Sequence, residues 1–204
     1  MRKGLALLFA VIVWFAVIAQ LILMIQNRTA SVPETIIRFF SFFTILTNTI
    51  VALFFTGQVL NIGRTYRPGI LSAVTVYIFM VGIVYQFLLR HIWQPKGLQL
   101  IVDELLHTIN PLIVLLYWYL YEKKSLVNYH QIKGWLVYPF TYLVYIMIRG
   151  SFSGFYPYPF VNVAEIGLPR ALVNSVVLTL FFIVISFLLV IVGRKTERKR
   201  LLPT

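Results

Sequence analysis

The sequence predicts an all-α, polytopic membrane protein: a six-transmembrane helical bundle with both termini in the cytoplasm. Three observations predict this class. Of the 204 residues, 60% are hydrophobic and only 12% are charged, whereas a soluble domain carries about 25% charged residues. Apolar runs close to the roughly 20 residues that cross a bilayer recur six times. The Lys and Arg residues are divided unevenly between the connections, as they are in membrane proteins.

The six apolar runs define the expected spans. The first, 5–25, follows a basic start and imitates a signal peptide, but its 21 residues exceed the roughly 7–15 of a secretory hydrophobic region. We therefore interpret it as a retained span. We treat the chain, 1–204, as a single transmembrane domain. The other five spans are expected at about 36–60, 69–89, 98–121, 135–148 and 171–193.

The basic residues predict the orientation. Twelve of the 18 Lys and Arg residues fall on the side that carries both ends of the chain, and 6 fall on the other side. Cytoplasmic connections are the basic ones, so both termini, including a basic tail at 194–204, are expected in the cytoplasm. An even number of spans requires the same arrangement. The net charge of +12 then follows from topology, and no nucleic-acid partner is expected. Membrane lipids are the expected partners and the cell membrane the expected location.

Several classes of site are excluded by composition and motif. The chain has no Cys, so disulfides, thiolate metal sites and cysteine nucleophiles are ruled out. It has no P-loop, dinucleotide fingerprint or H-E-x-x-H sequence. The stretch Gly150–Gly154 imitates a nucleophile elbow, but Phe152 stands where the motif requires Ser. No cofactor and no metal are therefore expected.

Two polar patches interrupt the apolar spans at depths where lipid is expected. Polar groups at that depth are costly and are functional candidates by default. One patch lies in the span 36–60 and the other in the span 98–121. Their members are Ser41, Thr44, Thr47 and Asn48 in the first, and His107 and Asn110, followed by Pro111, in the second.

The topology predicts that the two patches share a depth. Both spans run inward from the outer face. Thr44 lies 8 residues after Ile36, and His107 lies 9 residues after Leu98. At about 1.5 Å per residue, both lie about 12–14 Å below the outer boundary. Pro111 cannot donate a hydrogen bond to the carbonyl of His107, so a kink is expected at the histidine.

A hydroxyl beside an imidazole is the minimum for an activated oxygen nucleophile, because the histidine takes the proton and returns it to the leaving group. Asp103 or Glu104, one turn before His107, is a candidate to orient the ring. Arg149, at the outer end of the span 135–148, is a candidate partner for that carboxylate or for an anionic substrate head.

Each of these residues also has a structural interpretation. A Thr in a membrane helix usually donates to a carbonyl of its own helix, and small polar residues hold helices together. Asn48 and Asn110 fit interhelical hydrogen bonding as well as donation to an oxyanion. Asp103 and Glu104 also fit a solvated position near the interface, and Arg149 fits snorkelling to the interface.

Three stretches carry a resemblance to a known family. They are FFSFFTILTN, the spacing from His107 to Pro111 followed by YW, and YPFTYLVYIMIRGSFSGFYPYPFVNV. Together they resemble the bacterial Pr6Pr membrane proteins and, more distantly, the androgen-induced and androgen-dependent transmembrane hydrolases of animals. Those enzymes cleave fatty-acid esters of hydroxy fatty acids with a membrane-embedded Thr and His. The resemblance implies that Thr44 is the nucleophile and His107 its partner, with Thr47 the nucleophile if the register slips by one turn.

Two functions are therefore open. One is an intramembrane, threonine-dependent hydrolase of lipid or fatty-acid esters that uses a Thr–His dyad. The alternative is a non-catalytic membrane protein, either a small solute or ion transporter or an assembly scaffold. A transporter typically has inverted repeats with broken helices at the midplane, and no such repeat is evident. The hydrolase requires the Thr44 hydroxyl and the His107 ring to lie within reach of one another.

Overall fold

The computed structural model describes residues 1–201, apart from the side chains of Arg64 and 199–201. Over that range the chain is all-helical and contains no β-strand. It divides into two compact units, a first unit Met1–Val127 and a second unit Asn128–Thr204, which we describe separately. The predicted basic tail continues the last helix as far as Leu201, and its final residues, 202–204, lie outside the described residues.

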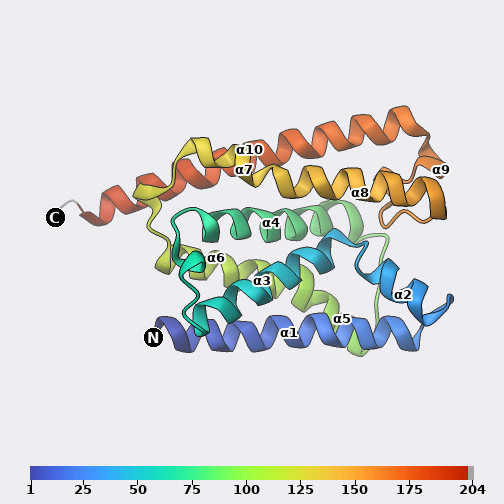
Figure 1. Cartoon of the computed structure of the whole chain (residues 1–204), viewed down its shortest axis with the longest axis horizontal. Helices are drawn as coiled ribbons and strands as arrows, with labels where there is room; N and C mark the ends of the chain where they lie inside the picture. Colours follow the sequence, from blue (N-terminus) through green and yellow to red (C-terminus); the bar gives the residue numbers. More distant parts are fainter. Residues whose placement is uncertain (202–204) are drawn as a thin grey trace. The chain divides into compact units, whose positions relative to one another are not determined.

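The first unit is a bundle of helices joined by short turns. Helix α1 packs along α3, and α4 packs against both α3 and α6 (Figure 1). Short 3₁₀ turns, Gly63–Tyr66 and Lys124–Leu126, follow α3 and α6. The helices are α1 (Arg2–Gln26), α2 (Val32–Phe39), α3 (Phe43–Val59), α4 (Ile70–Val84), α5 (Leu98–Glu104) and α6 (Asn110–Tyr121).

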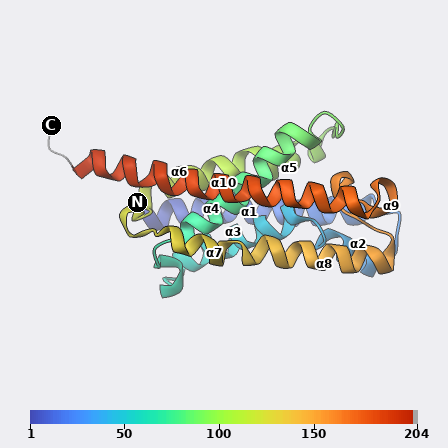
Figure 2. The same ribbon diagram turned by 90° about the horizontal axis from the view of Figure 1, so that it is seen from above.

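The second unit contains one long helix and several shorter ones. Helices α8 and α10 run in opposite directions (Figures 1 and 2). The turn between them contains α9 and a 3₁₀ turn, Pro159–Val161, and both contact α10. Another 3₁₀ turn, Tyr129–Gln131, precedes α7. The helices are α7 (Ile132–Trp135), α8 (Val137–Ser153), α9 (Val163–Ile166) and α10 (Leu168–Leu201).

Four of the predicted spans are helices of spanning length and apolar composition. In the described part of the chain these are Arg2–Gln26, Ile70–Leu89, Leu98–Tyr121 and Leu168–Arg198, and they cover the predictions 5–25, 69–89, 98–121 and 171–193. The pair α2 and α3 makes a fifth if a bent pair counts as one span. The structure therefore supports a polytopic helical membrane protein with four or five candidate spans.

The span predicted at 36–60 is not one straight helix but a bent pair of helices. Helix α2 ends at Phe39, α3 begins at Phe43, and the two are bent by 73°. Ser41 explains where the first helix stops. In a continuing α-helix the Ser41 amide would donate to the carbonyl of Ile37. Here the amide donates to the carbonyl of Arg38 instead, and the Ser41 hydroxyl donates to the Ile37 carbonyl at 2.7 Å. Ser side chains compete with helical hydrogen bonds in this way.

The predicted span at 135–148 corresponds to α8. This helix has 17 residues, fewer than the roughly 20 that cross the hydrocarbon. It is separated from α7 at Leu136. Pro139 accounts for the separation, because proline has no N–H to donate to the carbonyl of Trp135 four residues earlier.

The turn after α8 depends on a close approach at Gly150. A Cβ placed on Gly150 would lie 2.1 Å from Cε1 of Tyr156, and other ring atoms of Tyr156 lie almost as near. The ring of Tyr156 therefore occupies the space that a side chain at 150 would need. The segment that contains Tyr156 folds back onto α8 at this point because residue 150 has no side chain.

Replacing Gly150 with Ala is expected to destabilise the protein by about 1–3 kcal/mol, the usual cost of overpacking a closely packed site. Thermal unfolding in detergent micelles measures the loss. Gly134→Ala is the matched control, because nothing lies within 4 Å of a Cβ at that position and Ala favours helix over Gly. Equal melting temperatures for the two variants would contradict the packing proposed for Tyr156.

Two buried clusters hold the first unit together. Near the N-terminal half of α1, the ring of Phe9 lies edge-on to Phe55 and Tyr117. The other cluster lies beside the polar patches and joins α1, α2, α3, α5 and the turn after α5. Because it fixes the α2–α3 break against that turn, it also sets the position of the polar residues. Its buried members are Ala16, Val17, Phe39, Ile45, Val102 and Leu106.

Candidate functional site

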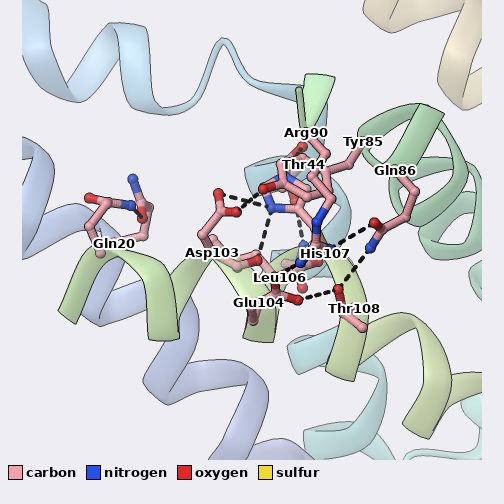
Figure 3. Close-up of polar contacts among 12 residues, drawn as sticks. Gln20, Thr44, Tyr85, Gln86, Arg90, Asp103, Glu104, Leu106, His107 and Thr108 are labelled. Carbon is pink, nitrogen blue, oxygen red and sulfur yellow. Dashed lines mark hydrogen bonds and ion pairs between the residues drawn. The ribbon is translucent and has the colours of Figure 1, made fainter. Parts of the chain in front are cut away.

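The two polar patches meet in the first unit. The Thr44 Oγ1 atom lies 3.4 Å from Nε2 of His107, although the two residues are 63 positions apart in the chain (Figure 3). Thr44 is the second residue of α3, directly after the α2–α3 break. The break therefore places the hydroxyl at a helix N-terminus, where the helix dipole stabilises negative charge.

His107 lies in a π-helical turn, Leu105–Ile109, between α5 and α6. The Asn110 amide bonds the carbonyl of Leu105, five residues back, and Pro111 has no amide hydrogen to donate. The Leu106 carbonyl is therefore left without a helical donor, and Nδ2 of Asn48 donates to it at 3.3 Å. The π-helical turn is where the helix accommodates the hydrogen bond that Pro111 cannot donate. Leu98–Tyr121 remains one candidate span. π-Helical turns of this kind are frequent at functional sites.

Asp103 contacts the other side of the imidazole ring. Nδ1 of His107 lies 3.0 Å from the Asp103 carbonyl oxygen and 3.3 Å from its Oδ1. A carbonyl oxygen can only accept, so Nδ1 carries the hydrogen. In the neutral ring Nε2 is then the acceptor, and it faces the Thr44 hydroxyl. This is the protonation pattern that a general base requires.

Tyr85 completes the contacts around the histidine, and the sequence interpretation missed it. Its hydroxyl donates to Oδ2 of Asp103. Its ring stacks on the His107 ring, with centroids 4.0 Å apart and planes 16° from parallel. An aromatic residue near the end of a span normally suggests the membrane interface, so Tyr85 carries no local signal of this role.

The amides of Asn48 and Asn110 connect α3 to the span that holds His107. Asn48 Nδ2 donates to the carbonyl of Thr44 at 2.8 Å as well as to Leu106, and Asn110 Nδ2 donates to Asn48 Oδ1 at 2.7 Å. Both N–H groups of Asn48 are thus used within the protein and are not directed at an oxyanion. Oδ1 of Asn110 is buried and accepts no hydrogen bond from the described residues.

The other hydroxyls of the first patch lie away from the imidazole contact. Thr47, one turn after Thr44, is completely buried at 0% exposure. Ser41 donates to Ile37 within the α2–α3 break. Thr44 is therefore the member of the patch whose hydroxyl contacts Nε2 of His107.

Glu104 belongs to a separate closed cycle of side-chain hydrogen bonds beside the Thr44–His107 dyad. It pairs with Arg90 and accepts from Oγ1 of Thr108 at 2.7 Å. Arg90 donates to Gln86, and Gln86 donates to Thr108 at 2.9 Å, which closes the cycle (Figure 3). The i, i+4 spacings of Gln86 with Arg90 and of Glu104 with Thr108 were available in the sequence as a signal. Asp103, and not Glu104, contacts His107.

Arg149 lies in the second unit. Its guanidinium donates to Ser153 at 3.2 Å and lies over the ring of Phe155, 5.1 Å from the centroid. The carboxylates for which it was a candidate partner have contacts within the first unit, Asp103 with Tyr85 and Glu104 with Arg90.

Comparisons with family models, curated proteins and solved structures found no match to this chain. Among the described residues, no group of three or more His, Cys, Asp or Glu side chains is arranged to hold a metal ion. The chemistry of the site is therefore inferred from the arrangement of Thr44, His107, Asp103 and Tyr85.

Proposed function

We propose that this protein is an intramembrane hydrolase of lipid or fatty-acid esters that uses Thr44 as nucleophile and His107 as general base and acid. One observation carries the proposal. Thr44 Oγ1, His107 and Asp103 form a continuous hydroxyl–imidazole–carboxylate series, with 3.4 Å and 3.3 Å between successive polar atoms. The same order of groups activates the nucleophile in serine hydrolases on unrelated folds.

In the first half of the reaction, Thr44 Oγ1 attacks the ester carbonyl carbon while its proton passes to Nε2 of His107. The tetrahedral intermediate collapses when the bond to the alcohol oxygen breaks, and Nε2 returns the proton to that oxygen. An acyl-Thr44 ester remains. Negative charge on Thr44 and on the carbonyl oxygen develops at the N-terminus of α3, which favours it.

In the second half, water attacks the acyl-Thr44 carbonyl and gives a proton to Nε2 of His107. The bond to Oγ1 breaks, Nε2 protonates Oγ1, and a carboxylic acid is released. Ester and water thus become acid and alcohol, and the protein returns to its starting state. The Asp103 carbonyl stays hydrogen-bonded to Nδ1, and the Asp103 carboxylate, whose Oδ1 lies 3.3 Å from Nδ1, stabilises the imidazolium that forms twice in the cycle.

The exposure of the residues fits this division of roles. Thr44 is 8% exposed and the His107 side chain 12% exposed, whereas Asn48 and Asn110 are both 0% exposed. The proposed reaction requires reactants to reach the first pair, whereas the second pair serves the contact between helices. A site at membrane depth receives its substrate from the bilayer, which favours an apolar ester over a soluble one.

The topology belongs to the same proposal. We propose six crossings in the cell membrane, with both termini in the cytoplasm and the bent pair α2–α3 counted as one crossing. Helices α7 and α8 together, from Ile132 to Ser153, give the length that α8 alone lacks. The bias of Lys and Arg supports the orientation, and the motifs around Thr44 and His107 support membership of the Pr6Pr family.

Replacing Thr44 with Ala is expected to abolish covalent labelling by a fluorophosphonate probe. The probe phosphorus bonds Oγ1, fluoride leaves, and the proton passes to His107. The assay uses purified full-length protein in lipid nanodiscs and measures the fraction of protein labelled. Thr49→Ala is the matched control, because Thr49 lies on the same helix and its hydroxyl donates to Ile45 within α3.

The outcomes separate the two functions. Labelling of the wild type and Thr49→Ala, but not of Thr44→Ala, supports the hydrolase. Loss of labelling in Thr47→Ala alone would move the nucleophile to Thr47. Equal labelling in wild type and Thr44→Ala would overturn the proposal and favour the non-catalytic alternative, in which the polar contacts serve a transporter or an assembly scaffold.

A further inference from the structure

Tyr85 occupies an unusual position beside the proposed dyad. It is 3% exposed and begins a π-helical turn, Tyr85–Leu89, at the end of α4. His107 lies within the second π-helical turn of the first unit, Leu105–Ile109. Two spans therefore depart from α-helical geometry at the two residues that stack on each other.

The contacts of Tyr85 act on the histidine by two routes. Its hydroxyl donates to Oδ2 of Asp103, while Oδ1 of the same carboxylate faces Nδ1 of His107. Its ring covers one face of the imidazole at 4.0 Å between centroids. The first route fixes the carboxylate whose Oδ1 lies 3.3 Å from Nδ1. The second limits rotation of the ring whose Nε2 faces Thr44.

The carboxylate needs such a donor. Asp103 is 4% exposed, and a buried charge is costly unless hydrogen bonds compensate it. Without the phenol, Oδ2 would lose the donor that keeps the carboxylate oriented toward His107. Stacking alone would leave the ring covered but its carboxylate partner free to turn.

We propose that Tyr85 is a positioning residue for the reaction, acting on His107 through Asp103 and through its own ring. This inference rests on the proposed function. The Tyr85 hydroxyl donates to Asp103 and its ring lies on the face of the imidazole, so Tyr85 is expected to change the rate at which Thr44 is activated and to leave substrate binding as it is. The hydroxyl and the ring make separable contributions, which Phe and Leu substitutions distinguish.

The test measures fluorophosphonate labelling of full-length protein in nanodiscs as a maximal rate constant, a half-saturating probe concentration and a final labelled fraction. Tyr85→Phe keeps the ring and removes the hydroxyl. It is expected to lower the maximal rate about 10- to 100-fold, the effect of losing a hydrogen bond to a charged group. Half-saturation and final labelled fraction are expected to stay unchanged. Tyr85→Leu, which removes the ring too, is expected to be slower still.

Tyr77→Phe is the matched control, since Tyr77 is another buried tyrosine of the candidate span Ile70–Leu89 and is expected to label at the wild-type rate. A double-mutant cycle tests the route through the carboxylate. If the hydroxyl acts through Asp103, the Tyr85→Phe change slows Asp103→Asn protein no further, so the two effects are not additive.

The outcomes distinguish this inference from the proposed function. Thr44-dependent labelling with an unchanged rate in Tyr85→Phe overturns the positioning role alone. A lower final labelled fraction at an unchanged rate also overturns it, because that pattern reports loss of folded protein. Full additivity with Asp103→Asn overturns the route through the carboxylate. Labelling that does not depend on Thr44 overturns both the inference and the function on which it rests.

Discussion

Replacing His107 with Gln is expected to lower the rate of fluorophosphonate labelling at Thr44 by about 10²- to 10⁴-fold, the usual contribution of a general base. Gln can still donate to the Asp103 carbonyl, which now lies 3.0 Å from Nδ1 of His107. It cannot take a proton from Thr44. The loss therefore reports the proton transfer and not the hydrogen bond that holds the side chain.

The chain supplies its own controls for this experiment. It has three histidines, and the other two, His91 and His130, lie in turns outside the site. His91→Gln and His130→Gln are expected to label at the wild-type rate. A His107→Gln protein that labels as fast as these two would show that Thr44 reacts without a base, and the dyad would have to be abandoned.

Replacing Asn48 with Leu is expected to destabilise the protein by about 1–3 kcal/mol, the combined contribution of its two interhelical hydrogen bonds. Asn48 makes three hydrogen bonds in a buried site, two as donor to the carbonyls of Thr44 and Leu106 and one as acceptor from Asn110. Interhelical hydrogen bonds in membrane proteins average about 0.6 kcal/mol and reach about 1.7 kcal/mol. Leu keeps the branched shape of Asn and its number of side-chain heavy atoms but cannot form these hydrogen bonds. Unfolding by SDS in mixed micelles measures it.

Asn27→Leu is the control for this series, because Asn27 is exposed and donates within its own helix end to Leu23. Asn110→Leu removes only one of the three bonds and is expected to cost less than Asn48→Leu. It also removes Oδ1, which accepts no hydrogen bond from the described residues. An Asn48→Leu protein as stable as Asn27→Leu would mean that these bonds contribute nothing to the packing of α3.

The depth argument from the sequence predicted that Thr44 and His107 share a level, and the structure places their polar atoms in contact. The helix geometry that brings them together differs from the one assumed in the depth argument, however. The count assumed one straight helix from Ile36, whereas α2 and α3 differ in direction by 73°. The break depends on Ser41 bonding Ile37, and a serine in a helix makes that choice according to its tertiary surroundings. Sequence spacing alone does not predict it.

The partners of His107 also depend on which helices lie next to one another, and the sequence does not predict that order. Asp103 and Glu104 are adjacent and were equal candidates to orient His107. Only the fold assigns Asp103 to the ring and Glu104 to Arg90. Tyr85 reaches Asp103 from a different span. A contact of this kind needs the order of the helices in the bundle, which hydropathy and charge bias do not give.

The two π-helical turns, Tyr85–Leu89 and Leu105–Ile109, have a consequence for the length of these spans. A π turn accommodates one residue more than an α turn, and one residue corresponds to about 100° of rotation about the helix axis. The helical phase after each turn is therefore offset from the phase before it. Deleting a single residue within either turn would leave the hydropathy almost unchanged but would rotate one half of the span against the other. The number of residues in these two spans is thus as constrained as their chemistry, and homologous sequences are best aligned without gaps across both turns.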